Sequence, residues 1–338
     1  MKNSIQIDAH SSKPKFQQLI EYIINGIEEG ELVRGQQLPS INEVSHNFGM
    51  ARMTVAKAYD DLREKGIITS HHGKGFYVSN TDTRSQLNIF VLFDALTPYK
   101  EILYDSLVAE LGENVTINIF FHHHNLKVFE NTILNHLGSY NFYIVMPHFN
   151  QDVTNVLQKI PKEKLLILDI DVPSFGTDYA ILYQDFKNNT YVGLNEAKEL
   201  IKKYQTFSLV LSSKSFQYTP VGIIQGFERF CHENNISYEI ISDLEEEEHL
   251  QKDHAYLVFR ENDLVRFINW SNKKGWKLGS DIGLMSYDDT PIKEILAEGV
   301  SVISNDFALM GKRAAQMIIS REKGRFVNKG YFIKRKSL

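Results

Sequence analysis

From residue 87 onward, short apolar runs of strand length alternate with segments of helical periodicity. The predicted strands are 87–93, 115–121, 142–146, 165–169, 207–211, 255–259 and 282–286. The predicted helices between them include 102–111, 128–137, 191–204, 222–234, 263–274 and 310–320. Apolar strands that alternate with helices are typical of parallel sheets with helices on both faces. The pattern predicts a doubly wound α/β fold, and because about 250 residues is long for one sheet, we expect two lobes.

The composition is that of an ordinary folded protein. Hydrophobic residues make up 43% of the chain and charged residues 23%, which is enough apolar material for a core and excludes disorder over most of the length. No apolar run approaches the ~20 residues of a membrane-spanning helix, and the polar residues 1–10 do not resemble a signal peptide. The single cysteine, Cys231, cannot form an internal disulfide, which fits a reducing cytoplasm. We expect a cytoplasmic protein without a membrane partner.

The first 78 residues carry the signals of a different, smaller domain. Apolar residues at three- and four-residue spacing predict a helix over 16–27. A capping box at residues 40–43 marks the start of the next helix, which stops at Gly49. Another helix opens at Arg52, and the residues after it alternate in polarity around a glycine tip. This order predicts a helix-turn-helix followed by a β-hairpin wing.

The exposed side of the helix that opens at Arg52 is the candidate DNA-binding face. Residues 1–80 hold nine basic and nine acidic side chains, so a cationic face depends on local placement rather than on net charge. Arg52 can bond both acceptors of a guanine in the major groove, whereas Thr54 and Lys57 suit phosphate oxygens. The candidate DNA-binding residues are Ser40, Asn42, Arg52, Thr54, Lys57, His72, Gly73, Lys74 and Gly75. Any solvated helix carries some charges of this kind, and the order of cap, turn, helix and wing favours DNA binding.

Residues 13–78 resemble the winged-helix domain of GntR-type bacterial transcription regulators. The motifs that carry the resemblance include Gly35-Gln36-Gln37-Leu38-Pro39-Ser40, Arg52-Met53-Thr54-Val55, Tyr59-Asp60-Asp61-Leu62 and Gly73-Lys74-Gly75-Phe76-Tyr77-Val78. Asn42 stands where the family usually has an arginine that contacts DNA, and Ala51 where it has a serine. Asn42 could bond adenine through its amide, and loss of the serine cap costs about 1 kcal/mol. The resemblance implies binding to double-stranded operator DNA.

Residues 87–338 resemble the periplasmic-binding-protein-like effector domain of LacI-type regulators. The matching motifs, in the family's order, include Leu166-Ile167-Leu168-Asp169, Gly226-Phe227, Asn262-Asp263, Ser286-Tyr287-Asp288-Asp289 and Ile303-Ser304-Asn305-Asp306. A GntR-type head on such a body is typical of the arabinose regulators of Gram-positive bacteria. The resemblance implies a homodimer that binds a small-molecule effector.

These signals predict three segments: a DNA-binding domain at 1–78, a small polar linker at 79–86, and an effector-binding and dimerisation domain at 87–338. We expect the large domain to divide into one lobe of about 87–184 and 306–328 and a second lobe of about 185–305 and 329–338. Ligands of such folds bind at the carboxyl ends of the strands, between the lobes.

The resemblance implies an effector that is a monosaccharide, held by polar side chains at strand ends with aromatic rings beside it. The candidate ligand-binding residues are Asp94, Tyr99, Glu101, His148, Asp169, Gln217 and Asp263. Asp169 and Asp263 are favoured, and their carboxylates could each accept two hydroxyl hydrogen bonds. The alternative for these two residues is helix capping, above all for Asp263.

One position departs from the sugar-binding pattern of the family. Ile223 stands where sugar-binding members commonly have an arginine, three residues before the Gly-Phe pair. Either Gln217, Tyr218 or Gln225 replaces this donor, or the ligand presents an apolar group there, as a pentose or a 6-deoxyhexose would.

No motif of the sequence supports an enzyme or a bound cofactor. The glycines around Lys74 lack the remaining residues of a phosphate-binding loop. The side chains of the consecutive residues His122, His123 and His124 diverge, so they do not suit a single zinc ion. No nucleophile elbow and no His-Glu-x-x-His pair is present. We expect a non-enzyme without cofactor or metal.

The leading hypothesis is a dimeric repressor of carbohydrate-utilisation genes that a small sugar releases from its operator. A regulator of the same architecture that needs its ligand to bind DNA, as an activator or a corepressed repressor, is the alternative. A third hypothesis is an intracellular sugar-binding or sugar-modifying protein without DNA function. Arg52 and the glycine wing argue against this third hypothesis, because neither would have a purpose in such a protein.

Overall fold

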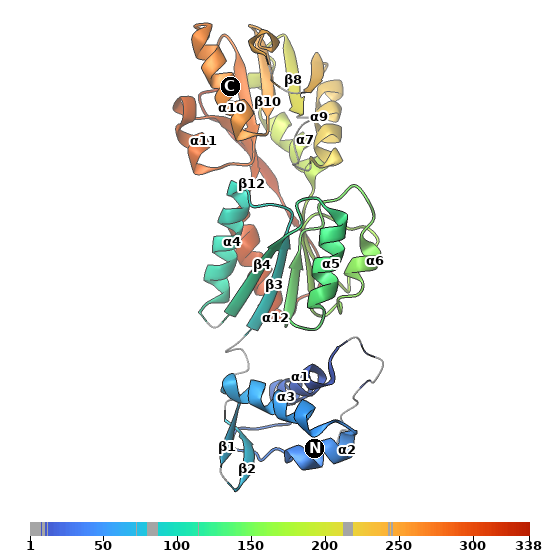
Figure 1. Ribbon diagram of the computed structural model, residues 1–338. Helices are drawn as coiled ribbons and strands as arrows, with labels where there is room; N and C mark the ends of the chain where they lie inside the picture. Colours follow the sequence, from blue (N-terminus) through green and yellow to red (C-terminus); the bar gives the residue numbers. More distant parts are fainter. Residues whose placement is uncertain are drawn as a thin grey trace. The chain divides into compact units, whose positions relative to one another are not determined.

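The computed structural model describes residues 8, 11, 13–71, 73–79, 87–113, 115–211, 219–242, 244 and 246–338 (Figure 1). By its internal contacts the chain divides into two compact units. The first consists of Met1–Val91, Gly112–Phe120 and Glu130–Tyr143, and the second of Leu92–Leu111, Phe121–Phe129 and Ile144–Leu338. The boundaries expected at residues 78 and 87 stay a prediction, since most of the expected linker lies outside the described residues.

The N-terminal elements form the predicted helix-turn-helix and wing. They are helices α1 (Lys15–Glu28), α2 (Ile41–Phe48) and α3 (Arg52–Glu64), followed by strands β1 (Ile68–His71) and β2 (Gly75–Val78), which pair antiparallel. The capping box is present, because the Glu43 amide donates to the Ser40 hydroxyl at 3.2 Å and the Ser40 amide donates to the Glu43 carboxylate at 2.7 Å. Gly49 ends α2 at φ 58°, a left-handed conformation that glycine adopts without steric cost.

A small core holds these helices together. Its buried side chains come from all three helices and the wing, and include Leu19, Ile23, Val44, Val55, Leu62 and Val78. Tyr59 of α3 is buried and donates its hydroxyl hydrogen bond to the Pro39 carbonyl at 2.7 Å, which ties α3 to the segment that leads into α2. The Ser45 hydroxyl of α2 donates to the Met50 carbonyl in the turn at 2.6 Å, so packing and these side-chain hydrogen bonds together set the relative orientation of α2 and α3.

The rest of the chain contains two six-stranded sheets, as the alternating pattern predicts. The first has the order β13-β7-β6-β5-β3-β4 and consists of β3 (Leu87–Phe93), β4 (Val115–Phe121), β5 (Phe142–Val145), β6 (Leu165–Asp169), β7 (Ala180–Gln184) and β13 (Gly324–Asn328). The second has the order β14-β12-β11-β10-β8-β9 and consists of β8 (Thr206–Leu211), β9 (Tyr238–Ser242), β10 (His254–Val258), β11 (Gly283–Tyr287), β12 (Ser301–Asn305) and β14 (Gly330–Ile333). In the second sheet only β14 runs antiparallel to its neighbour.

The helices of the large domain follow the strands along the chain. They are α4 (Pro98–Leu111), α5 (Leu126–His136), α6 (Thr154–Leu157), α7 (Phe186–Glu196), α8 (Lys198–Ile201), α9 (Val221–Glu233), α10 (Glu261–Lys273), α11 (Pro291–Ile295) and α12 (Phe307–Ser320). Short 3-10 turns lie at Glu247–His249 and Leu296–Glu298. None of the helices in the described part of the chain is long and apolar enough to cross a membrane.

Alternate side chains of the second sheet enter two separate cores. Phe207, Leu209 and Leu257 pack with Phe227 and Phe230 of α9 on one face. On the other face Val210, Tyr256 and Leu284 pack with Leu264 and Phe267 of α10. Figure 1 shows α7 and α9 on one side of this sheet and α10 on the other. Helices on both faces make this a doubly wound sheet, which confirms the predicted fold class.

Helix α4 is held closely against α12. A Cβ atom placed on Gly311 of α12 would lie 2.1 Å from the Leu103 carbonyl oxygen of α4, so no other residue fits without moving the two helices apart. This close approach matters for the site below, because the first turn of α4 carries Tyr99 and Lys100.

Candidate functional site

The first turn of α3 presents the predicted base-contacting residue to solvent. Arg52 is exposed, Thr54 is half-buried, and Lys57 is exposed one turn further along the helix. The Lys57 ammonium lies 4.2 Å from the centre of the Phe16 ring, a cation–π contact with α1. The first turn of α3 contains no acidic residue, and Ala51 makes no side-chain cap. This end of the helix is therefore positive through its dipole and its side chains alike.

Two of the predicted DNA-binding residues lie at the start of α2. Asn42 is exposed, so its amide is open to a partner. The Ser40 hydroxyl accepts the capping hydrogen bond from Glu43, so this oxygen already serves the fold. A DNA contact of Ser40 remains a prediction and would involve its hydroxyl proton, because its amide and carbonyl are bonded to Glu43 and Val44.

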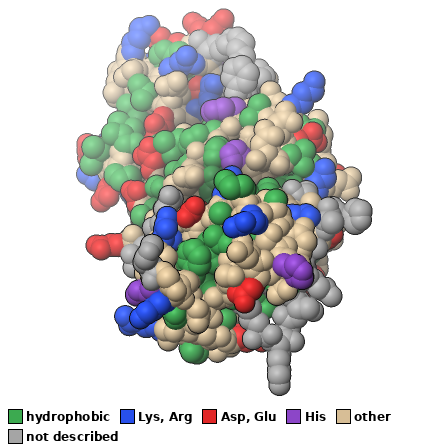
Figure 2. Space-filling model, turned by 60° about the horizontal axis from the view of Figure 1, so that its bottom comes forward, with side chains coloured by type: hydrophobic (Ala, Val, Ile, Leu, Met, Phe, Trp, Pro, Cys, Tyr) green, Lys and Arg blue, Asp and Glu red, His purple; other side chains and the backbone are tan. Residues whose placement is uncertain are grey.

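The wing has an exposed glycine-rich tip. Gly73 and Gly75 have φ values of 71° and 98°, and between them the side chain of Lys74 is exposed. The Lys74 carbonyl accepts hydrogen bonds from the Gln37 amide at 2.7 Å and the Tyr77 hydroxyl at 3.0 Å, which fixes the tip to the rest of the head. The face in Figure 2 shows Lys and Arg side chains scattered among acidic and apolar ones rather than gathered in one large basic patch. His72 lies outside the described residues.

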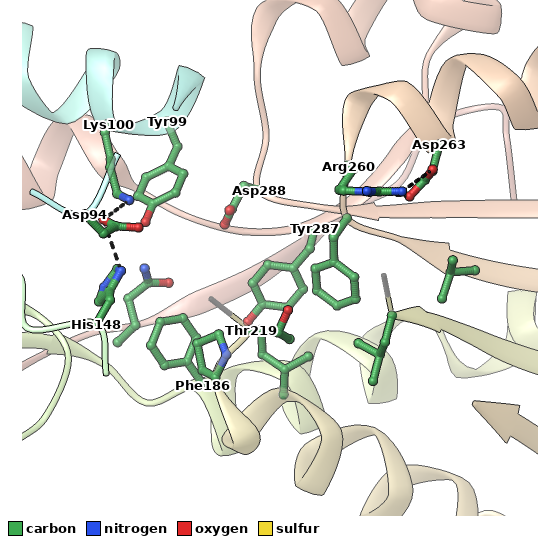
Figure 3. A pocket seen from close by; sticks show the side chains of 16 residues that line it. Asp94, Tyr99, Lys100, His148, Phe186, Thr219, Arg260, Asp263, Tyr287 and Asp288 are labelled. Atoms are coloured by element: carbon green, nitrogen blue, oxygen red, sulfur yellow. Dashed lines mark hydrogen bonds and ion pairs between the residues drawn. The ribbon is translucent and has the colours of Figure 1, made fainter. Parts of the chain in front are cut away.

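A pocket lies at the carboxyl ends of strands from both sheets, entirely within the second compact unit (Figure 3). Its lining side chains are Asp94, Tyr99, Lys100, His148, Gln184, Phe186, Val210, Leu211, Thr219, Pro220, Ile223, Phe259, Arg260, Asp263, Tyr287 and Asp288. Charged groups lie at its two ends, and aromatic and aliphatic side chains lie between them together with Asp288. Such a mixture of apolar walls and a few polar groups is typical of a small-molecule site.

At one end of the pocket, two aspartates are bridged by a histidine. Asp94 follows β3 and bonds the Lys100 ammonium, and its Oδ1 lies 3.2 Å from Nδ1 of His148. The Nε2 of the same imidazole lies 2.9 Å from Oδ2 of Asp169, at the end of β6. Asp169 is completely buried and also accepts hydrogen bonds from the Tyr99 hydroxyl at 3.1 Å and the Gln184 amide at 2.5 Å.

The charges in this cluster stabilise one another. Burial opposes the charged form of each group, but His148 and Lys100 outweigh it for the carboxylates, so the pKa values of Asp94 and Asp169 are lowered. In the same way the two carboxylates outweigh burial for the imidazole and raise the pKa of His148 above its ordinary value of 6.5. The imidazole and the two carboxylates therefore favour one another's charged forms.

The contribution of His148 to stability is expected to disappear as the pH rises above 6.5. Because its pKa is raised by folding, this contribution is complete below the unfolded-state value and is lost as the pH passes through the folded-state value. A His148→Gln variant cannot be protonated, so its free energy of unfolding should lack this decline. Urea denaturation of both proteins from about pH 6 to about pH 9 makes the comparison. An equal decline in the two proteins would assign the pH dependence to groups other than Asp94, Asp169 and the imidazole between them.

At the other end of the pocket, a forked cation faces the cavity. Arg260 is the residue before α10 and bonds Asp263 through two nitrogens, with distances of 2.7 and 2.8 Å. Asp263 is buried and makes no helix cap, since its carboxylate is occupied by this pair. The guanidinium also lines the pocket, as Figure 3 shows. Arg260 thus places a cationic side chain in the pocket that Ile223 also lines.

Asp288 lies between these two ends. It follows β11 with φ 62°, a left-handed conformation, and its Oδ1 is buried without a hydrogen-bond partner among the described residues. The buried Lys293 ammonium donates to the carbonyls of Tyr287 and Asp288, at 2.7 and 2.6 Å, rather than to the carboxylate. Burial raises the pKa of Asp288 to about 7. An unpartnered acceptor in a pocket wall suits a ligand that donates a hydrogen bond.

The remaining wall is apolar. Ile223 of α9, Val210 and Leu211 of β8, and Phe186 of α7 contribute aliphatic and aromatic surface. The rings of Phe259 and Tyr287 stack with centres 5.4 Å apart.

Four of the residues predicted from sequence line this pocket: Asp94, Tyr99, His148 and Asp263. Asp169 lies directly behind two of them, bonded to His148 and Tyr99. Glu101 is exposed in the first turn of α4 and is not among the lining residues, and Gln217 lies outside the described residues. The sequence-based prediction missed Lys100, Arg260, Tyr287 and Asp288. The three histidines 122–124 follow β4, and the described residues contain no group of His, Cys, Asp or Glu that could hold a metal ion.

Two families match parts of the sequence. Residues 15–78 match the gntR family of bacterial regulatory proteins, and residues 200–329 match the periplasmic binding protein-like domain. The HTH-type transcriptional regulator Rv1152 of Mycobacterium tuberculosis is 30% identical over 82 residues, which cover 24% of this chain and 68% of that protein. The HTH-type transcriptional repressor YtrA of Bacillus subtilis is 37% identical over 75 residues, which cover 22% and 58%. The arabinose metabolism transcriptional repressor of Geobacillus stearothermophilus is 24% identical over 102 residues, which cover 30% and 28%.

The curated relatives are therefore matched over part of their length, from about a quarter to about two thirds in these three. Among solved structures, a lac repressor bound to ONPG superposes with a TM-score of 0.64 at 17% identity, covering 88% of this chain and 94% of that chain. At this level of identity the likeness establishes the fold of the large domain.

Proposed function

Because this chain belongs to the gntR family of bacterial regulatory proteins, we propose that it is a repressor of carbohydrate-utilisation genes which a small sugar releases from its operator. Membership of the family makes it a DNA-binding transcription regulator rather than a member of an enzyme family. One observation supports the proposal of a sugar-released repressor: the same chain contains an exposed helix suited to DNA and a pocket with polar groups at strand ends. The name of the arabinose metabolism repressor among its relatives supports the link to carbohydrates.

The pocket has the chemistry that a small polyol requires. The Asp288 carboxylate can accept hydroxyl hydrogen bonds, and the Arg260 guanidinium can donate them. Beside these groups, Phe186 and Phe259 offer ring surface and Ile223 offers aliphatic surface. A ring with hydroxyls on one side and a bare edge on the other, such as a pentose or a 6-deoxyhexose, would use both kinds of wall.

The proposed mechanism couples the two sites through the arrangement of the lobes. The chain passes from one sheet to the other after β7, after β12 and between β13 and β14, so three segments join the lobes. A sugar that contacts side chains from both lobes favours the arrangement in which all those contacts form. It can weaken DNA binding only if it binds that arrangement more tightly than the DNA-bound one. We propose a cytoplasmic homodimer, in which each winged helix binds one half of a two-fold operator.

Titration of a DNA duplex by the purified full chain, with and without single sugars, tests this function. The duplex is obtained by selection from a random library, and the panel contains neutral pentoses, hexoses and 6-deoxyhexoses. We expect one sugar to weaken DNA binding at least about tenfold, as coupling free energies of 1–3 kcal/mol allow. A sugar that instead strengthens binding would support the alternative of a ligand-dependent activator or corepressed repressor. Failure to select any sequence would favour a sugar-binding protein without DNA function.

An Asp288→Asn variant is expected to bind the releasing sugar about 5- to 30-fold more weakly, which corresponds to about 1–2 kcal/mol. The amide keeps the side-chain size but replaces one acceptor oxygen by a donor, so a sugar hydroxyl loses its partner in a partly buried wall. DNA binding without sugar should stay unchanged, which yields a repressor that no longer releases its operator. Calorimetry with the sugar and duplex titration of the same preparation measure the two effects. The matched control is Asp178→Asn, in an exposed pair with Lys162, and equal sugar affinity in all three proteins would remove Asp288 from the site.

A further inference from the structure

Met53 is the most exposed large hydrophobic side chain in the described part of the chain, with 80% of its surface open to solvent. It is the second residue of α3. The other large apolar residues of this helix, Val55, Tyr59 and Leu62, are buried in the core of the head. An apolar side chain that stays in water contributes nothing to folding through burial. Packing within the head therefore does not explain a methionine at this position.

The surroundings of Met53 are those of the candidate DNA-binding face. It lies between Arg52 and Thr54, at the end of α3 that a helix-turn-helix directs at base edges. Lys57 is four residues further along and shares its side of the helix. Ala51, two residues before Met53, is small and exposed, so it does not cover the methionine side chain. The long, flexible, apolar side chain of Met53 thus lies beside Arg52, which suits guanine, and Thr54 and Lys57, which suit phosphate.

We propose that Met53 recognises the 5-methyl group of a thymine adjacent to the base that Arg52 contacts. This inference rests on the proposed DNA-binding function and extends it to base specificity. The thymine methyl is the one apolar group that the base pairs present in the major groove. The unbranched thioether of methionine adapts its shape to such a group, and contact removes both from water. Arg52 would then select guanine by hydrogen bonds and Met53 would select thymine by apolar contact.

The test compares thymine with uracil, which differ only in the 5-methyl group. A duplex is first selected from a random library with the full chain, and each thymine of the selected site is then replaced singly by uracil. We expect one replacement per half-site to weaken binding by the wild-type chain about three- to tenfold. Met53→Ala should bind the thymine duplex more weakly by a similar factor and should no longer distinguish it from the uracil duplex.

The matched control is Val33→Ala, which removes another exposed apolar side chain of the head, 55% exposed and outside α3. This variant should bind like the wild-type chain and should keep the same preference for thymine over uracil. It therefore separates contact with the methyl group from a general loss of apolar surface.

The outcomes separate this inference from the function on which it rests. If the wild-type chain selects no sequence, both fail. If it selects a sequence but no thymine is sensitive to loss of its methyl group, DNA binding stands and the role of Met53 is wrong. If the preference for thymine persists in Met53→Ala, another side chain recognises the methyl group, and the inference is wrong as well.

Discussion

Replacing Asp94 by alanine is expected to lower the free energy of unfolding by about 3–5 kcal/mol, the usual cost of removing one partner from a buried ion pair. Lys100 is 1% exposed, and Asp94 is the carboxylate that it bonds. Without Asp94 the Lys100 ammonium is left buried without its carboxylate partner, and His148 loses one of its two carboxylates. Urea denaturation near neutral pH, followed by far-ultraviolet circular dichroism, measures the change.

A second substitution identifies the cause of this loss. Adding Lys100→Met to Asp94→Ala removes the uncompensated charge, so the double variant should recover a large part of the lost stability. Asp178→Ala breaks the exposed pair with Lys162 and should change stability little, because water already solvates both groups. If Asp94→Ala is no less stable than Asp178→Ala, the network around His148 does not hold this part of the fold together.

Local signals made the head predictable from sequence. The capping box at Ser40, the glycine that ends α2 and the apolar spacing of α3 each act within a few residues, and all three occur in the structure. Local chemistry of this kind specifies a helix boundary before any tertiary contact forms.

Burial on both faces accounts for most, but not all, of the strand predictions in the large domain: β4 was predicted although it is largely half-exposed, and β7 and β12 were missed although they are buried. All seven predicted strands are present, and in the six other than β4 the continuous apolar run fits cover on both faces. The strands that were missed include β9 and β13, whose residues are largely half-exposed, so no such run exists in them. Strand β14 was also missed; it follows β13 after a single residue but lies in the other sheet.

Prediction of the pocket succeeded at strand ends and failed elsewhere. Asp94, His148 and Asp169 follow or end strands, and the carboxyl ends of parallel strands meet at one edge of a sheet. Lys100 lines the pocket because of the way α4 is oriented about its own axis. That orientation depends on the close packing of α4 against α12. Arg260 was overlooked, although its spacing of three residues from Asp263 is typical of a helical ion pair. This arginine places a cation in the pocket that Ile223 also lines, and its pair with Asp263 could have been found from that spacing.

Arg52→Ala is expected to weaken binding to the selected operator by about 1–3 kcal/mol, roughly 5- to 150-fold, and to relax specificity at one base of each half-site. Arg52 is exposed at the first position of α3, and among the described residues no ion pair occupies its guanidinium. Its two donors are therefore available to the O6 and N7 atoms of a guanine, and alanine offers neither. Titration of the operator duplex, and of duplexes that carry each other base at the guanine, measures affinity and specificity together.

Lys57→Ala provides the contrast that makes the assignment of Arg52 specific. Lys57 lies on the same helix and suits a phosphate, so its loss should weaken all sequences about equally and lower the slope of log affinity against log salt by about one unit. Lys57 is exposed, so its cation–π contact with Phe16 is weak. This contact should therefore not prevent the Lys57 ammonium from turning toward DNA. Base-specific loss in Arg52→Ala together with uniform, salt-dependent loss in Lys57→Ala would establish α3 as the recognition helix. Equal affinity of Arg52→Ala and the wild-type chain for the operator would show that base recognition lies elsewhere in the head, with Asn42 and the wing as the remaining candidates.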